Sequence, residues 1–191
     1  MTNRLFTLAL ALAAFAAPGR GVDLIKEGAV FKYHKGTKDA SSPRSAWTGI
    51  DFDDASVDGA DFTLASLATE GEEADIDFEK ASMTGASFKK ASLTTEGTEA
   101  AIDFEEASLP GANFEEASLA TEGKEAAIYF RYASMTGANF GEASLATKGD
   151  YADIGFSQAD LTDANFGKAS LNTEGYGADI YFDKADLIRD K

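Results

Sequence analysis

Few side chains in this sequence have the chemistry of a catalytic or metal-binding site. The chain lacks cysteine, and its single histidine, His34, lies between Lys32 and Lys35. Without cysteine there is no thiol catalysis, disulfide bond or cysteine-type zinc site, and a lone histidine near lysines is typical of a solvated position. The sequence motifs of serine hydrolases, zinc peptidases, P-loops and dinucleotide sites are also absent. We therefore expect a protein that is not an enzyme and needs no cofactor.

Three glutamates are the candidate ligands for a cation. Glu70, Glu96 and Glu122 follow one another at intervals of 26 residues, and Lys148 takes the next position. If that interval is one structural repeat, their carboxylates stack about 4.8 Å apart and repel one another unless a cation bridges them. A selective Ca²⁺ site surrounds the ion with about six or more oxygens, which a single column does not provide. The sequence predicts weak cation binding here and no dedicated metal site.

The charge balance restricts the partners. The chain has 17 Lys plus Arg against 33 Asp plus Glu, a net charge of −16. From residue 50 onward the counts are 10 and 30, whereas residues 17–49 carry six basic and three acidic side chains. Phosphate backbones and anionic membranes are bound by clustered Lys and Arg. We therefore expect neither a nucleic acid nor a membrane as a partner.

The interval of 26 residues runs through the second part of the chain. The tripeptide Ala-Ser-Leu recurs at this interval from Ala65 to Ala169. Within each interval, large apolar residues lie five apart, and a small residue stands two positions before most of them. Apolar spacings that alternate between 2 and 3 fit neither a helix, which needs about 3.6, nor a flat strand, which needs about 2. They indicate a short strand and a bend, repeated, so that four sides close one coil and the coils stack through backbone hydrogen bonds.

The large residues of these units form columns, which we predict to be the interior. Eleven of the 14 phenylalanines occupy just two columns, so that stacking places Phe on Phe and Leu on Leu. The predicted core comprises Phe52, Phe62, Phe78, Phe88, Phe104, Phe114, Phe130, Phe140, Phe156, Phe166, Phe182, Leu67, Leu93, Leu119, Leu145 and Leu171.

The five-residue units resemble the repeats of the pentapeptide-repeat family. The units that carry the resemblance include ADFTL, ASFKK, ASLTT, ANFEE, ANFGE, ADLTD and ANFGK, and in-frame units extend from about Ile50 to Leu187. The resemblance implies an all-β fold, a right-handed quadrilateral β-helix. Over residues 50–191 the interval allows about five and a half coils.

Every coil carries six residues more than four five-residue sides need. The glycines within this insertion, from Gly71 to Gly175, indicate a turn with positive φ. After the turn, Ala74, Ile76 and Phe78 alternate with acidic residues, which is the pattern of a half-buried strand. We expect a longer strand on this side, an outward ridge of Thr-Glu-Gly turns that the core does not need, and a cross-section like a lengthened rectangle.

The first 49 residues differ from the repeats. Arg4 precedes a short apolar run with small residues at Ala14 and Ala16, which is the pattern of a signal peptide. The run is shorter than the roughly 20 residues that span a bilayer. We therefore expect a signal peptide at residues 1–16, an N-terminal cap at 17–49 and a mature chain that is exported to the periplasm or secreted.

Two functions agree with these features. The first is a non-catalytic exported scaffold whose outer faces bind a protein or a glycan. The second is an acidic inhibitor of a DNA-binding protein, which the resemblance suggests because some pentapeptide-repeat proteins mimic DNA and bind gyrase. Lys89-Lys90 is followed one interval later by Glu115-Glu116, and such alternation favours a charge ladder that fixes the register of the coils. An open C-terminal coil, together with the resemblance, also suggests a homodimer joined there.

Overall fold

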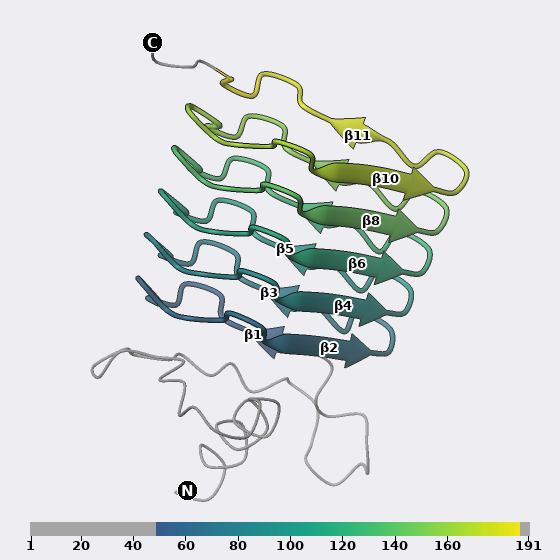
Figure 1. Cartoon of the computed structure of the whole chain (residues 1–191). Coiled ribbons are helices and arrows are strands. Elements are labelled where there is room, and N and C mark those ends of the chain that lie inside the picture. Colours follow the sequence, from purple (N-terminus) through teal and green to yellow (C-terminus); the bar gives the residue numbers. More distant parts are fainter. Residues whose placement is uncertain (1–48, 188–191) are drawn as a thin grey trace, which may run out of the picture.

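The computed structural model describes residues 49–187 and shows an all-β solenoid of about five turns built from parallel strands, wound as a right-handed β-helix (Figure 1). The fold class expected from the sequence is confirmed. The expected signal peptide and nearly all of the expected cap fall in residues 1–48, which lie outside the described residues, as do residues 188–191. Within residues 49–187 there is no helix with the length and apolar character to cross a membrane.

Two parallel sheets run along the solenoid, and each takes one strand from every coil. The six-stranded sheet has the order β1-β3-β5-β7-β9-β11, and the five-stranded sheet has the order β10-β8-β6-β4-β2. The strands are β1 (Ile50–Asp51), β2 (Ser66–Glu70), β3 (Ile76–Asp77), β4 (Ser92–Glu96), β5 (Ile102–Asp103), β6 (Ser118–Glu122), β7 (Ile128–Tyr129), β8 (Ser144–Lys148), β9 (Ile154–Gly155), β10 (Ser170–Glu174) and β11 (Ile180–Tyr181).

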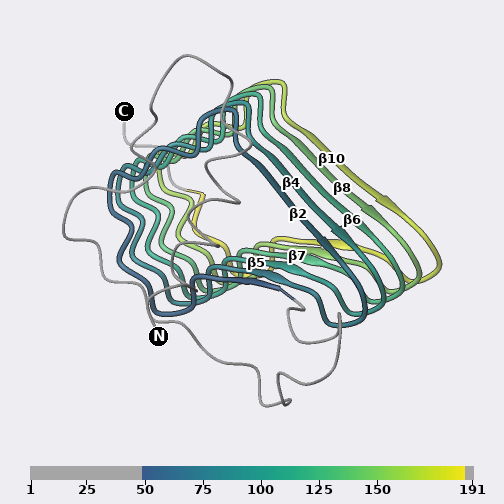
Figure 2. The same cartoon turned by 90° about the horizontal axis from the view of Figure 1, so that it is seen from below.

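The register confirms the repeat of 26 residues. Leu67 pairs with Leu93, and Leu93 pairs with Leu119. The two remaining sides of each coil are held by single bridges, such as Ser82 with Ser108. Seen along the axis, the coils follow one another with the same four-sided outline, which is drawn out at the corner where the five-residue strands end (Figure 2). The lengthened cross-section expected from the insertion is therefore present.

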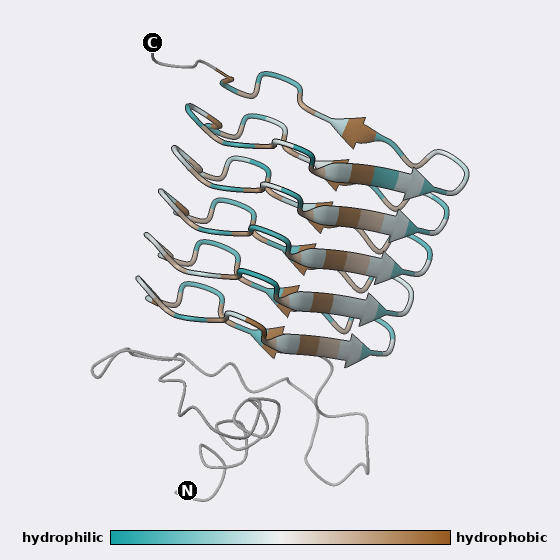
Figure 3. Ribbon diagram, viewed as in Figure 1, coloured by the Kyte–Doolittle hydropathy of each residue, from teal (hydrophilic) through white to brown (hydrophobic). Residues whose placement is uncertain are grey.

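The phenylalanines form two continuous stacks inside the coils. Phe88 and Phe114 lie parallel with ring centroids 4.8 Å apart, and Phe104 and Phe130 repeat this geometry at 4.8 Å. The two stacks meet edge to face, as between Phe104 and Phe114, where the centroids are 5.6 Å apart. Both arrangements are favourable for aromatic pairs and add to the gain from burial. Apolar residues recur at the same place in every coil (Figure 3).

Nearly all predicted core residues are buried. Those from Phe52 to Phe156 are at most 5% exposed. Phe166 and Leu171 are partly buried against the core, and Phe182 is 38% exposed. The difference arises because no described coil covers the layer that contains these three side chains.

The insertion differs from the expectation in two respects. The five-residue strand precedes the glycine turn, as in β4, whereas only two residues after the turn form a strand, as in β5. The threonine before the glutamate also points inward: Thr95 is fully buried, and its hydroxyl donates a hydrogen bond to the carbonyl of Ala100. Because Ala74 and Ile76 are fully buried as well, the expectation that the core does not need this segment is wrong.

The glycine in the turn is required by both conformation and space. Gly97 has a φ of 149°, and a Cβ there would lie 2.0 Å from the carbonyl oxygen of Gly71 in the preceding coil. Gly123 repeats this close approach with Gly97. Any side chain at these positions would push neighbouring coils apart, so the stacking distance itself selects glycine.

Candidate functional site

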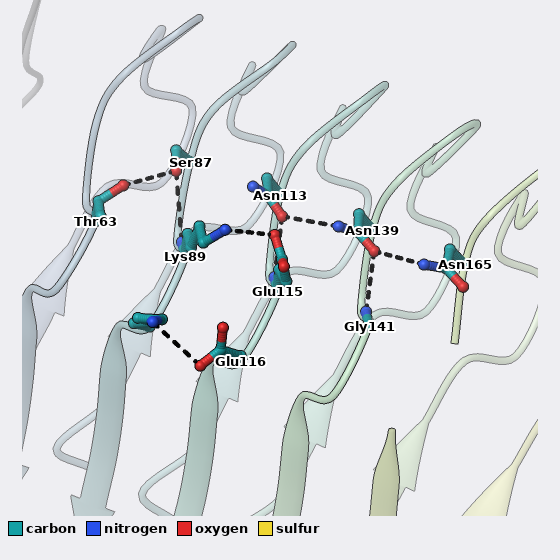
Figure 4. A network of polar contacts seen from close by, with 10 residues as sticks. Thr63, Ser87, Lys89, Asn113, Glu115, Glu116, Asn139, Gly141 and Asn165 are labelled. Atoms are coloured by element: carbon teal, nitrogen blue, oxygen red, sulfur yellow. Dashed lines mark hydrogen bonds and ion pairs between the residues drawn. The ribbon is translucent and has the colours of Figure 1, made fainter. Parts of the chain in front are cut away.

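Opposite charges lie one coil apart on the outer surface, as the sequence predicts. The Nζ of Lys89 lies 2.7 Å from Oε2 of Glu115 (Figure 4), and the Nζ of Lys90 lies 3.3 Å from Oε2 of Glu116. The further pairs between neighbouring coils are Arg131 with Glu105, Lys148 with Glu122 and Lys168 with Glu142. Exposed pairs of this kind contribute about 0–1 kcal/mol each, so that their main effect is on register.

The glutamate column has the expected order. Glu70 pairs in register with Glu96, Glu96 with Glu122, and Glu122 with Lys148. The carboxylate of Glu122 accepts a hydrogen bond of 2.8 Å from Lys148 and raises the pKa of that ammonium group. Among residues 49–187, no group of three or more acidic or histidine side chains is placed to hold a metal ion. Weak cation binding at this column stays a prediction.

An asparagine ladder, which the repeat pattern did not predict, runs along another side. The amide of Asn139 donates to Oδ1 of Asn113 at 3.2 Å, and the amide of Asn165 donates to Oδ1 of Asn139 at 2.8 Å (Figure 4). Backbone N–H groups two residues further on, such as that of Gly141 at 3.0 Å, donate to the same oxygens. An open groove of about 250 Å³ lies beside the ladder. Because these side-chain amides form hydrogen bonds with one another, we interpret the ladder as a structural element.

The outer face of the six-stranded sheet carries stacked carboxylates in its first half. Asp51, Asp77 and Asp103 pair in register on β1, β3 and β5. Burial, followed by repulsion from Asp51 and other neighbouring acids, raises the pKa of Asp77 to about 7. Burial, with a smaller contribution from Asp77, raises the pKa of Asp103 to about 6. The raised pKa values of Asp77 and Asp103 mean that these two carboxylates take up protons near neutral pH.

The second half of the same face carries tyrosines, and an open groove extends from the level of β5 into this half. The groove has a volume of about 630 Å³ and is lined by Glu99, Ala101, Glu125, Tyr129 and Tyr151. These residues come from three successive coils: the glutamates and Tyr151 from the turns, Ala101 from the segment before β5, and Tyr129 from β7. Tyr151 is 49% exposed. We call this feature the tyrosine groove.

Substitutions within the repeat produce the tyrosine groove. Tyr129 stands in the column of Asp103, and Tyr151 stands in the column of Glu125. The next residue in each column is a glycine. A Cβ at Gly155 would lie 3.5 Å from the Tyr129 ring, and one at Gly177 would lie 2.8 Å from the Tyr151 ring. Each tyrosine therefore rests against a position without a side chain.

Charged groups surround the tyrosine groove. The guanidinium carbon of Arg131 lies 4.1 Å from the centroid of the Tyr129 ring, and Nη2 lies 2.5 Å from Oε2 of Glu105. Burial raises the pKa of Tyr129, with Asp153 and other acids contributing. This arrangement combines aromatic faces with carboxylates, which are groups that bind cations.

Comparisons with known proteins found matches among solved structures alone. No family model matches the chain, and no curated protein matches it. Among solved structures, it resembles the pentapeptide repeat protein Rfr23 from the cyanobacterium Cyanothece 51142 with 17% identity and a TM-score of 0.28, covering 69% of this chain and 90% of that chain. A trypsin-treated variant of QnrB1, a plasmid-mediated fluoroquinolone resistance protein, has 15% identity and a TM-score of 0.16, covering 70% and 87%.

Proposed function

We propose that the chain is an exported, non-catalytic β-solenoid that acts as a scaffold and binds a protein or a glycan through its outer face. The observation that carries the proposal is the placement of the tyrosines. Tyr129 and Tyr181 lie in β7 and β11, Tyr132 lies in the corner after β7, and Tyr151 and Tyr176 lie in the turns that lead to β9 and β11. Tyr132, Tyr151 and Tyr176 are 52%, 49% and 74% exposed. Exposed tyrosine is enriched where proteins bind partners, because its ring supplies contact area and its hydroxyl a hydrogen bond.

An acidic inhibitor of a DNA-binding protein such as gyrase is the alternative. The dense charge of the first coil favours it, since residues 50–75 contain nine acidic and no basic side chains. The charges of later coils disfavour it, because Lys89 and Lys90 neutralise acids of the next coil. A mimic of a phosphate backbone needs regularly repeated, unneutralised negative charge.

Location and capture together test the proposed function. The full chain, expressed in a bacterial host, should be found outside the cytoplasm, shortened by about 16 residues at its N-terminus, the usual size of a signal peptide. Immobilised, it should retain a protein or glycan from the cell envelope, and Tyr151→Ala should retain less than Tyr132→Ala does. Retention in the cytoplasm together with capture of a DNA-binding protein would replace this proposal by the alternative.

The C-terminal coil is proposed to join two copies of the chain. Ile180, Phe182 and Leu187 are 37%, 38% and 62% exposed, and an open end of a solenoid offers unpaired backbone groups to another chain. Sedimentation of the full chain should therefore give a dimer that Phe182→Asp converts to a monomer. A monomer at high protein concentration would contradict this interface.

A further inference from the structure

We propose that the tyrosine groove binds the cationic side chains of an extended polypeptide segment. The inference rests on the proposed function and names the partner of one face. The site would take Lys or Arg side chains at the Tyr151 ring and at the carboxylate of Glu99. It requires no catalytic step.

The chain already contains one cation held in the same way. Arg131 lies over the ring of Tyr129 while its guanidinium bonds Glu105. A cation over an aromatic face is attracted by the ring, and a neighbouring carboxylate adds a charge-assisted hydrogen bond. The groove offers the same two kinds of group on different coils, an aromatic ring in Tyr151 and a carboxylate in Glu99. Glu99 forms no ion pair among residues 49–187, although its charge also acts on Lys124, which pairs with Glu125.

The charges around the groove remain negative after the internal pairs are counted. Lys124 lies 2.7 Å from Glu125 and neutralises its carboxylate. Arg131 neutralises Glu105 in the same way. Glu99 and Asp153 then remain, and Asp103 joins them above its pKa of about 6. A cationic segment is therefore attracted to this side, whereas a phosphorylated or acidic segment is repelled.

The tyrosines are held in place before a partner arrives. The ring of Tyr151 lies against Gly177 and meets Tyr176 edge to face, with centroids 5.8 Å apart. The ring of Tyr129 lies against Gly155 and is stacked with Arg131. Because these contacts restrict the rings, binding costs less side-chain entropy than it would at freely rotating residues.

The dimensions of the groove fit a short extended chain. Its lining comes from three successive coils, which spans about 10 Å at the usual spacing between strands. Three or four extended residues cover that length. Alternate side chains of such a segment point to the same side, so a sequence with Arg or Lys at every second position would place two cations on this face.

The experiment is a calorimetric titration of the full chain with a blocked tetra-arginine peptide in 0.15 M NaCl. Tyr151→Ala and Glu99→Gln should each weaken binding about five- to tenfold, the range expected for a cation–π contact and a charge-assisted bond. The matched controls, Tyr132→Ala and Glu116→Gln, remove the same groups outside the groove and should change affinity less than about twofold. Thermal melts confirm that all four variants are folded.

Two outcomes would overturn the inference. Equal weakening by groove variants and controls would mean that the peptide binds the acidic surface at large. Groove-dependent binding of a neutral oligosaccharide such as cellohexaose, without binding of tetra-arginine, would reject the cationic partner and leave the proposed scaffold function intact. Absence of any envelope partner in the capture experiment, with the peptide still bound in the groove, would instead reject the proposed function.

Discussion

The two halves of the six-stranded sheet share a backbone and differ in their outer side chains. On β1, β3 and β5 the outward column is Asp51, Asp77 and Asp103, whereas on β7 and β11 it contains Tyr129 and Tyr181. The residues beneath this face, including Ile and Phe of every coil, stay the same. The inner columns are therefore constrained by stacking, whereas the outer columns are free to change and are where function is to be sought.

The largest effect should be equal in the two halves, because it concerns the shared interior. Phe104 lies beneath the aspartates and Phe130 beneath the tyrosines, and both rings are fully buried. The two substitutions to compare are Phe104→Asp and Phe130→Asp. Each change buries an unpaired carboxyl group and should lower the free energy of unfolding by about 4 kcal/mol or more. Denaturant unfolding measures this, with Glu115→Ser as an exposed control that should cost less than about 0.5 kcal/mol. A much smaller loss in one half would mean that its core is less tightly packed.

A smaller effect should distinguish the two halves, namely the pH dependence of the free energy of unfolding. The folded-state pKa of Asp77 is raised from 3.8 to about 7, so the folded chain binds a proton more tightly than the unfolded chain. The stability from this proton is complete below pH 3.8 and disappears as the pH rises through about 7. We expect the free energy of unfolding to be about 1 kcal/mol greater at pH 5 than at pH 8, after allowing for solvent screening at this half-buried group.

Asp77→Asn should remove most of this pH dependence, since an amide carries no proton that titrates here. Asp179→Asn, on the tyrosine half, is the control and should leave the slope between pH 5 and pH 8 nearly unchanged. A slope of opposite sign in the parent chain would show that the stacked aspartates do not govern stability in this range.

The smallest effect should again be equal in the two halves, because it concerns the backbone conformation that they share. At the corner after the sheet, Glu106 and Gln158 both adopt left-handed conformations, with φ of 57° and 59°. Glycine adopts this conformation without steric cost, although it loses more entropy on folding. Glu106→Gly and Gln158→Gly should each raise the free energy of unfolding by about 0.5 kcal/mol. Unequal changes would indicate that the corners of the two halves differ.

The sequence was sufficient to predict the interior. The phenylalanines of the repeats follow a single spacing pattern. Columns such as that of Phe88 and Phe114 can be recognised in the sequence because a buried position tolerates few residue types. The same reasoning predicted the ion pairs, since Lys89 and Glu115 stand exactly one repeat apart.

Three features could not be read in this way. Thr95 belongs to the Thr-Glu-Gly turns that the sequence predicts to form an outward ridge, yet its hydroxyl donates a hydrogen bond to a carbonyl inside the coil. The left-handed corners occur at charged residues such as Lys90, for which sequence gives no conformational signal. The tyrosine groove depends on Gly155 and Gly177 lying beside tyrosines of the preceding coil, and comparison of outer columns would have revealed it.

The stacking of coil on coil also determines how the molecule opens. Each coil contacts only the coils beside it, so a coil inside the stack must break hydrogen bonds on both sides to unfold, whereas a terminal coil breaks them on one side. Amide hydrogen exchange should therefore be slowest in β6 and become faster toward β2 and β10. A partner bound across several coils would slow amide exchange in all of them together, because it would oppose unfolding that begins at the end coils.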